Sequence, residues 1–174
     1  LSIINRDLQV NGFMPNLALE EGQEALEPFV KNANVIVVDN LSTLVRAGKE
    51  NEANSWNPIA EWALGLRSQG KSVIFIHHAG KDNNQRGTSK KEDILDTVIN
   101  LKHPSDYNSE EGARFEIHFE KSRGFAGEEA KPFQVQLKLE NNQASWQVSK
   151  IEDLQVERVL ELSREGLTQR EIAG

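Results

Sequence analysis

An aspartate directly follows an unbroken apolar run in the first quarter of the chain. Asp39 ends the run Val35–Val38, a pattern typical of a strand that is buried on both faces of a parallel sheet. The carboxyl ends of such strands line the ligand crevice of open α/β sheets. A carboxylate at that position can hold Mg²⁺ beside nucleotide phosphates, usually through water. The alternative is an ordinary turn that Asp39 opens together with Asn40 and Ser42.

Two adjacent histidines follow the next apolar run. His77 and His78 come directly after Val73–Ile76, and imidazoles at a strand end can bind metal, shuttle protons or sense a phosphate. Neighbouring side chains on an extended segment point to opposite sides, so we expect one histidine, His78, to face the site. The alternative is a pair of ordinary polar residues at the point where a strand reaches the surface.

Basic residues gather in two further segments. A polar loop between Lys81 and Lys91 can contact a phosphate backbone, although it has no aromatic residue for base stacking and can equally be a solvated loop. Lys121 and Arg123 follow Phe119 and keep its strand parity, which predicts that they continue an apolar, core-facing row. Two cations in such a row need an anion, which a neighbouring subunit's nucleotide or a local carboxylate can supply.

Apolar periodicity predicts the elements that must hold these residues. Continuous apolar runs indicate strands of a parallel sheet at Leu1–Ile4, Val35–Val38, Ser72–Ile76 and Thr97–Leu101. Helical spacing is found over Leu19–Val30 and from Ser55 to Arg67, with Ser55 as the expected N-cap and Gly70 just beyond the end. This alternation predicts an α/β fold in which helices flank a parallel sheet.

The second half of the chain follows a different pattern. Apolar and polar residues alternate from Phe115 to Phe119, from Phe133 to Leu139 and from Ala144 to Val148, which predicts antiparallel strands that extend one edge of the sheet. Asn141-Asn142 is the expected turn. After Ser149 we expect an amphipathic helix, a break at Gly166 and a capping box from Thr168 to Glu171, which is how a helix-turn-helix begins.

Composition narrows the class of protein. The 174 residues include no cysteine, which excludes disulfides and thiolate metal sites and fits a cytoplasmic protein. The net charge of −7 argues against a protein whose whole surface binds nucleic acid. No apolar run reaches the roughly 18 residues of a membrane span. The phosphate-binding motif G-x-x-x-x-G-K-[ST] is absent, and both ends of the sequence appear inside elements, so we interpret the chain as a fragment.

Four motifs in chain order resemble the RecA-like hexameric replicative helicases of the plasmid RepA type. They are Val35–Leu41 as Walker B, Ile76–Lys81, Arg86–Asp93 and Glu120–Gly124. The resemblance covers residues 1–148 and implies a partial RecA-like P-loop NTPase core without its P-loop segment; residues 149–174 would begin a truncated helix-turn-helix. Neither the P-loop nor the family's catalytic glutamate has a counterpart here.

The resemblance implies roles for individual residues. Asp39 would support Mg²⁺ beside ATP, with Asn40 and His77 next to the nucleotide and His78 as the polar sensor near the γ-phosphate. Lys121 and Arg123 would form the finger that reaches the adjoining subunit of a ring, which for this family is a hexamer. The polar loop between Lys81 and Lys91 would contact single-stranded DNA through Arg86, Thr88, Ser89, Lys90 and Lys91.

These observations lead to one leading hypothesis and two others. The leading one is a fragment of an ATP-dependent DNA helicase or translocase of replication. The second is a non-catalytic regulatory or DNA-binding protein on a degenerate RecA-like scaffold, and the third, a metal-dependent phosphoesterase, lacks further ligands at strand ends. The leading hypothesis requires Asp39 and His78 to lie side by side at one edge of the sheet.

Overall fold

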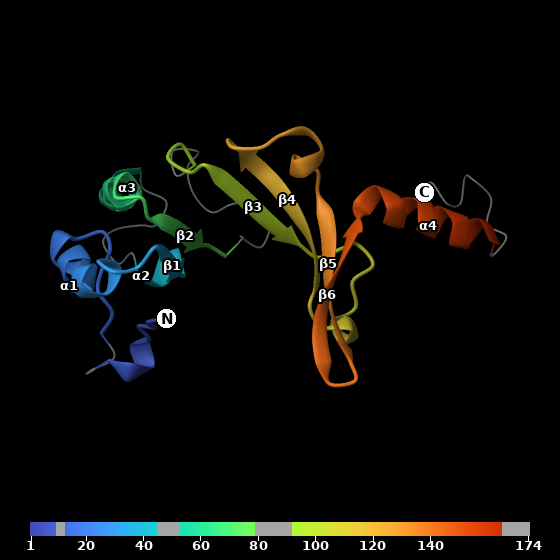
Figure 1. Cartoon of the computed structure of the whole chain (residues 1–174), viewed down its shortest axis with the longest axis horizontal. Coiled ribbons are helices and arrows are strands. Elements are labelled where there is room, and N and C mark those ends of the chain that lie inside the picture. The colour runs from blue at the N-terminus through green and yellow to red at the C-terminus, as the bar shows by residue number, and fades with distance from the viewer. Residues whose placement is uncertain (10–12, 45–52, 79–91, 165–174) are drawn as a thin grey trace. The chain divides into compact units, whose positions relative to one another are not determined.

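The chain forms two compact units. A computed structural model describes residues 1–9, 13–44, 53–78 and 92–164 (Figure 1). Unit 1 comprises Leu1–Leu95 and unit 2 comprises Asp96–Gly174. Within the described residues no helix is long and apolar enough to cross a membrane.

Unit 1 is a two-stranded parallel sheet with helices on one face. Its elements in chain order are η1 (Arg6–Leu8), α1 (Glu20–Val30), β1 (Val35–Asp39), α2 (Leu41–Leu44), α3 (Ala53–Ser68) and β2 (Ser72–Ile76). The strands pair in register, with Val35 opposite Ser72 and Asp39 opposite Ile76. The crossover through α3 is the connection that a parallel pair of strands requires.

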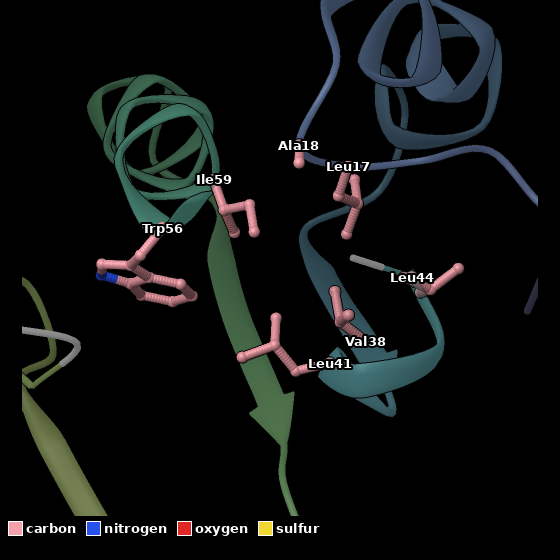
Figure 2. Close-up of a cluster of buried hydrophobic side chains, with 7 residues drawn as sticks. All are labelled: Leu17, Ala18, Val38, Leu41, Leu44, Trp56 and Ile59. Carbon is pink, nitrogen blue, oxygen red and sulfur yellow. The ribbon is translucent and has the colours of Figure 1, made fainter. Parts of the chain in front are cut away.

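The core of unit 1 lies between the sheet and its helices (Figure 2). Alternate strand residues such as Val38 point into it, and Leu17 and Ile59 are its most deeply buried side chains. The rings of Trp56 and Phe75 meet edge to face with centroids 5.5 Å apart. The full buried cluster is Leu17, Ala18, Val38, Leu41, Leu44, Trp56 and Ile59.

Polar contacts fix the helices around this core. Gln23 on α1 donates from its amide nitrogen to the carbonyl oxygens of Leu17 and Pro58, at 2.8 and 3.2 Å, so it joins α1 to α3. Gly70 follows α3 with φ of 78°, a conformation that glycine adopts without a steric penalty. The Lys71 N–H then donates to the Leu66 carbonyl, which completes a Schellman cap.

Unit 2 is a four-stranded antiparallel sheet followed by a helix. Its strands pair in the order β3 (Thr97–Lys102), β4 (Arg114–Ser122), β5 (Phe133–Glu140) and β6 (Gln143–Lys150). The short helices η4 (Ser109–Glu111) and η5 (Gly127–Ala130) lie in the connections, and α4 (Ile151–Arg164) follows β6. Asn141 and Asn142 have φ of 51° and 63°, as a two-residue hairpin turn of this kind requires.

The β3–β6 sheet has one polar and one apolar face. Paired residues on neighbouring strands, for example Phe115 with Val135 and Leu137 with Trp146, share a side of the sheet. We call this side the apolar face; it consists of Ile99, Leu101, Phe115, Ile117, Phe119, Phe133, Val135, Leu137, Leu139, Ala144, Trp146 and Val148. The opposite face carries mainly charged, amide and hydroxyl side chains, together with the imidazole of His118 and the buried Val98.

The structure confirms most of the expected elements and corrects four. Leu1–Ile4 forms no strand. Thr97–Leu101 is a strand but pairs antiparallel with β4, and the antiparallel strands form a sheet of their own, not an extension of the β1–β2 sheet. Ser55 lies inside α3 and is not its N-cap. The break at Gly166 and the capping box at Thr168 lie outside the described residues.

Candidate functional site

The carboxyl edge of the β1–β2 sheet brings together the residues on which the leading hypothesis depends. Asp39 is opposite Ile76 in the parallel register, so His77 and His78 follow immediately at the same edge. The structure therefore meets the expectation that Asp39 and His78 emerge from neighbouring strands at one edge of the sheet. Both residues are exposed to solvent, and neither is enclosed by apolar packing.

Exposure along β2 indicates which histidine faces the same side as Asp39. From Ser72 to His78 exposed and half-buried residues alternate, with Ile76 and His78 exposed and His77 half-buried. Asp39 is the exposed partner of Ile76. The alternation therefore supports the assignment of His78, and not His77, to the side of Asp39.

Asn40 has a local structural role next to Asp39. Its side-chain oxygen accepts a hydrogen bond of 3.1 Å from the Thr43 N–H, and its carbonyl oxygen accepts one of 2.9 Å from the Thr43 hydroxyl. These are the contacts of a residue that begins a helical turn, here α2. The turn that was the alternative explanation for this segment is thus present, and it fixes the backbone directly after Asp39.

A cavity of about 1110 Å³ runs along the outer edge of β1. All five residues of β1, including Asp39, line it together with the N-terminal segment Leu1–Arg6 and residues from α1. Neither His77 nor His78 belongs to its lining. Asp39 therefore lines this cavity, whereas the two histidines at the end of the neighbouring strand do not.

Asp39 has few potential co-ligands among its neighbours. In the described part of the chain no group of three histidine, aspartate or glutamate side chains lies close enough to hold a metal ion. A cation at Asp39 would take its other oxygen ligands from water or from a bound phosphate, as Mg²⁺ commonly does beside nucleotides. The exposed, oxygen-donor carboxylate fits such water-mediated binding.

Lys121, near the end of β4, does not lie in the apolar row in which the sequence pattern predicts it. Val98 pairs with Lys121 whereas Ile99 pairs with Phe119, which leaves Glu120 as an extra residue in a bulge. Because Val98 and Ile99 are successive strand residues and point to opposite faces, Lys121 lies on the face opposite Phe119. The expectation that Lys121 continues the apolar row is therefore wrong, and the bulge is the reason.

Arg123 lies just beyond β4 and beside a carboxylate. Its guanidinium nitrogen is 4.0 Å from a carboxylate oxygen of Asp96, and both side chains are about half exposed. Its backbone N–H donates a 2.9 Å hydrogen bond to the Asp96 carbonyl. The local ion pair that was the alternative for this residue is therefore present in a loose form. Exposed pairs of this kind contribute little to stability.

The predicted DNA-binding residues lie outside the part of the chain that the structure describes; they are Arg86, Thr88, Ser89, Lys90 and Lys91.

Comparison with protein-family models, curated proteins and solved structures gives no match to the chain. What the structure establishes is a mixed α/β chain with a small parallel sheet and a four-stranded antiparallel sheet.

A polar network in unit 2 was not anticipated from the sequence. The Arg114 side chain, only 13% exposed, pairs with Asp106 and with Glu111, each at 2.9 Å, and its Nε donates to Gln134 at 3.2 Å. Asn108 and Glu111 form a capping box around η4. The spacing of an asparagine and a glutamate three residues later is the sequence signal that could have predicted this turn.

Proposed function

We propose that the carboxyl edge of β1 and β2 is part of an ATP site, and that the chain belongs to a RecA-like ATPase that moves on or unwinds DNA. The observation that carries the proposal is the pairing of Asp39 with Ile76, which puts an exposed carboxylate and an exposed imidazole on adjacent strand ends. Ligands of open α/β sheets bind outside this end of the strands. The four motifs that resemble those of RecA-like helicases indicate ATP as the ligand.

In this proposal each residue of the edge has a separate task. Asp39 orients the water shell of Mg²⁺, which when bound would neutralise charge on the phosphates of ATP. His78 donates a hydrogen bond to a phosphate oxygen from the neighbouring strand. Asn40, whose oxygens hold the turn of α2, keeps the backbone after Asp39 in place, and the half-buried His77 supports the strand end.

The β1–β2 sheet itself supports an α/β core in which helices cover both faces of the sheet. Val35, Val37, Ile74 and Ile76 are apolar and substantially exposed on the face away from α1 and α3. Parallel strands with apolar residues on both faces are a feature of sheets that carry helices on both sides. Exposure of this second face is therefore what a RecA-like sheet would present if only one of its two helical layers were in place.

The remaining parts of the proposal concern assembly and DNA. Lys121 and Arg123 near the end of β4 would contact the nucleotide of an adjoining subunit in a ring, which is a hexamer in the family that the chain resembles, and stabilise transition-state charge. For Arg123 this requires release of Asp96, which the 4.0 Å separation makes inexpensive. The segment from Arg86 to Lys91 would contact single-stranded DNA.

Paramagnetic NMR on the full chain tests the proposed edge. Mn²⁺ with ATP should broaden the amide signals of Asp39, Asn40 and His78 first, because a bound Mn²⁺ relaxes nearby nuclei even when affinity is low. Asp39→Asn should weaken this broadening by about tenfold, since a neutral amide is a poorer ligand for a hard cation. Glu24→Gln, which removes an exposed carboxylate from α1, is the matched control and should change nothing.

Equal broadening in the wild type and in Asp39→Asn would refute the nucleotide edge. The second hypothesis, a non-catalytic regulatory or DNA-binding protein, is compatible with the Asp96 contact of Arg123, which gives this cation a local partner without a nucleotide. A chain that responds to single-stranded DNA but not to Mn²⁺ and ATP would support that hypothesis instead.

A further inference from the structure

The outer edge of β1, away from β2, carries backbone groups that lack a partner in the described part of the chain. β1 belongs to a two-stranded sheet, and the hydrogen bond from the Ser72 N–H to the Asn34 carbonyl sets the phase of its pairing with β2. In a parallel pair, every second residue of a strand bonds to the neighbour through both its N–H and its C=O. These groups of Ile36 therefore point toward β2, whereas those of Val35 and Val37 point outward.

The cavity along β1 adds apolar side chains to this row of backbone groups. All five residues of β1 line it, as do Leu26 and Phe29 of α1, and Phe29 is about half exposed. An extended peptide uses both features, because its main chain pairs with a free strand edge while its alternate side chains enter pockets. A compact small molecule would leave backbone groups that recur roughly every 6.6 Å along a strand unpaired.

The charge around the cavity favours a basic residue at one end of such a peptide. Asp39 ends β1 and lines the cavity, and among the described lining residues Arg6 is the other charged one. The neighbouring helix α1 carries glutamates and neither lysine nor arginine. A lysine or arginine that lies beside Asp39 would therefore be attracted both by this carboxylate and by the acidic helix.

We propose that the outer edge of β1 binds an extended segment of a partner protein, which has apolar side chains at alternate positions and a lysine or arginine beside Asp39. The segment adds a third strand to the β1–β2 sheet. Its backbone pairs with Val35 and Val37, and its apolar side chains pack against the wall that contains Phe29. The proposal does not rest on the nucleotide edge, so the peptide should bind whether or not Mn²⁺ and ATP do.

NMR on the full chain with a synthetic heptapeptide tests the pairing. The probe alternates valine and threonine between two terminal lysines, so that either strand direction puts a cation beside Asp39. An excess of this peptide should slow hydrogen exchange at the Val35 and Val37 amides by at least about tenfold, because pairing protects an N–H group. The amide of Ile36, already paired with β2, should change less. The same peptide with its central amides N-methylated has no donors for the edge and should give no protection.

Three variants separate the contributions to binding. Phe29→Ala should weaken binding of the peptide by about fivefold, because an apolar contact is lost. Leu64→Ala, at a side chain of similar exposure on α3 outside the cavity lining, should leave binding unchanged. Asp39→Asn should weaken the lysine peptide by about threefold, and should not weaken a peptide with glutamine in place of lysine.

Three results would overturn the proposal. The first is an absence of protection at millimolar peptide, and the second is equal protection by the N-methylated peptide, which would mean that the cavity takes apolar groups without strand pairing. The third is protection of Val35 and Val37 that rises with protein concentration when no peptide is present. That result would assign the edge to a second copy of the chain.

Discussion

In unit 1, helices bury one face of a short sheet. In unit 2, strand pairing and ion pairs stabilise the fold, and few of the described side chains are buried. Leu17 and Ile59 of unit 1 are almost completely enclosed. In the described part of unit 2, the buried residues are Val98, Pro104, Gln134 and Val135, and Gln134 contacts Arg114. Unit 1 should therefore respond chiefly to changes of apolar volume, and unit 2 to changes of charge and hydrogen bonding.

The largest expected effect is loss of apolar volume in unit 1. Ile59→Ala should reduce the free energy of unfolding by about 3–4 kcal/mol, because it removes buried methyl groups and leaves a cavity. Leu64→Ala on the same helix, at a side chain 41% exposed, should cost below about 1 kcal/mol. Urea unfolding followed by tryptophan fluorescence in a Trp146→Phe background reports on Trp56 and Trp62 of unit 1. Equal costs at the two positions would contradict this account of the core.

The residues that the sequence placed correctly are those whose geometry follows from strand direction alone. Asp39 and His78 lie at one edge because two parallel strands joined by a crossover end on the same side. Alternation across the β5–β6 hairpin likewise predicted its turn at Asn141 and Asn142. In these places the local pattern and the final pairing carry the same information.

The misplaced residues depended on partners that a local pattern does not specify. Leu1–Ile4 has the composition of a strand, but a strand exists only where another strand pairs with it. Ile99–Lys102 alternates apolar and polar residues, a signal of the half-exposed antiparallel strand that it forms, yet the run Thr97–Leu101 suggested a parallel one. The bulge at Glu120 shifts Lys121 to the other face of the sheet. No residue type at this position predicts a bulge.

The next largest effect should come from the polar network of unit 2. Arg114→Lys should cost about 2 kcal/mol, because an ammonium group cannot bridge Asp106, Glu111 and Gln134 at once and leaves charged partners unsatisfied. Arg123→Lys, the same substitution just beyond the end of β4, should cost less than about 0.5 kcal/mol at its exposed, loosely paired site. Hydrogen exchange of peptides from β4 and β5 measures both. Similar losses would show that the network does not stabilise unit 2.

A smaller effect should appear as a pH dependence confined to unit 2. Hydrogen bonds from the Arg114 guanidinium, assisted by the Asn108 N–H, hold the pKa of Glu111 below its ordinary value of 4.5. A carboxylate with a lowered pKa in the folded state stabilises the fold above its unfolded pKa, and this contribution is lost as pH falls through the folded pKa.

The pH dependence is measured as hydrogen exchange of β4 and β5 between neutral pH and acid. Protection should decline below about pH 4.5 in the wild type and decline less in Glu111→Gln, which has no proton to gain. The effect is smaller than that of Arg114→Lys because Asp106 still pairs with Arg114. An identical acid response in both proteins would assign the loss to other carboxylates, such as Glu128, whose pKa is lowered by Lys131.

The smallest effects compare two glycines of unit 1 that differ only in backbone conformation. Gly65 lies within α3 and Gly70 caps it with φ of 78°, and an added methyl group would meet no atom within 4 Å at either position. Gly65→Ala should stabilise the fold by about 0.5–1 kcal/mol because alanine loses less backbone entropy in a helix. Gly70→Ala should destabilise it by about 1 kcal/mol because an L-residue resists the left-handed conformation. Since neither change alters buried volume or charge, shifts of the same sign in urea unfolding would mean that the end of α3 is not held by the glycine cap.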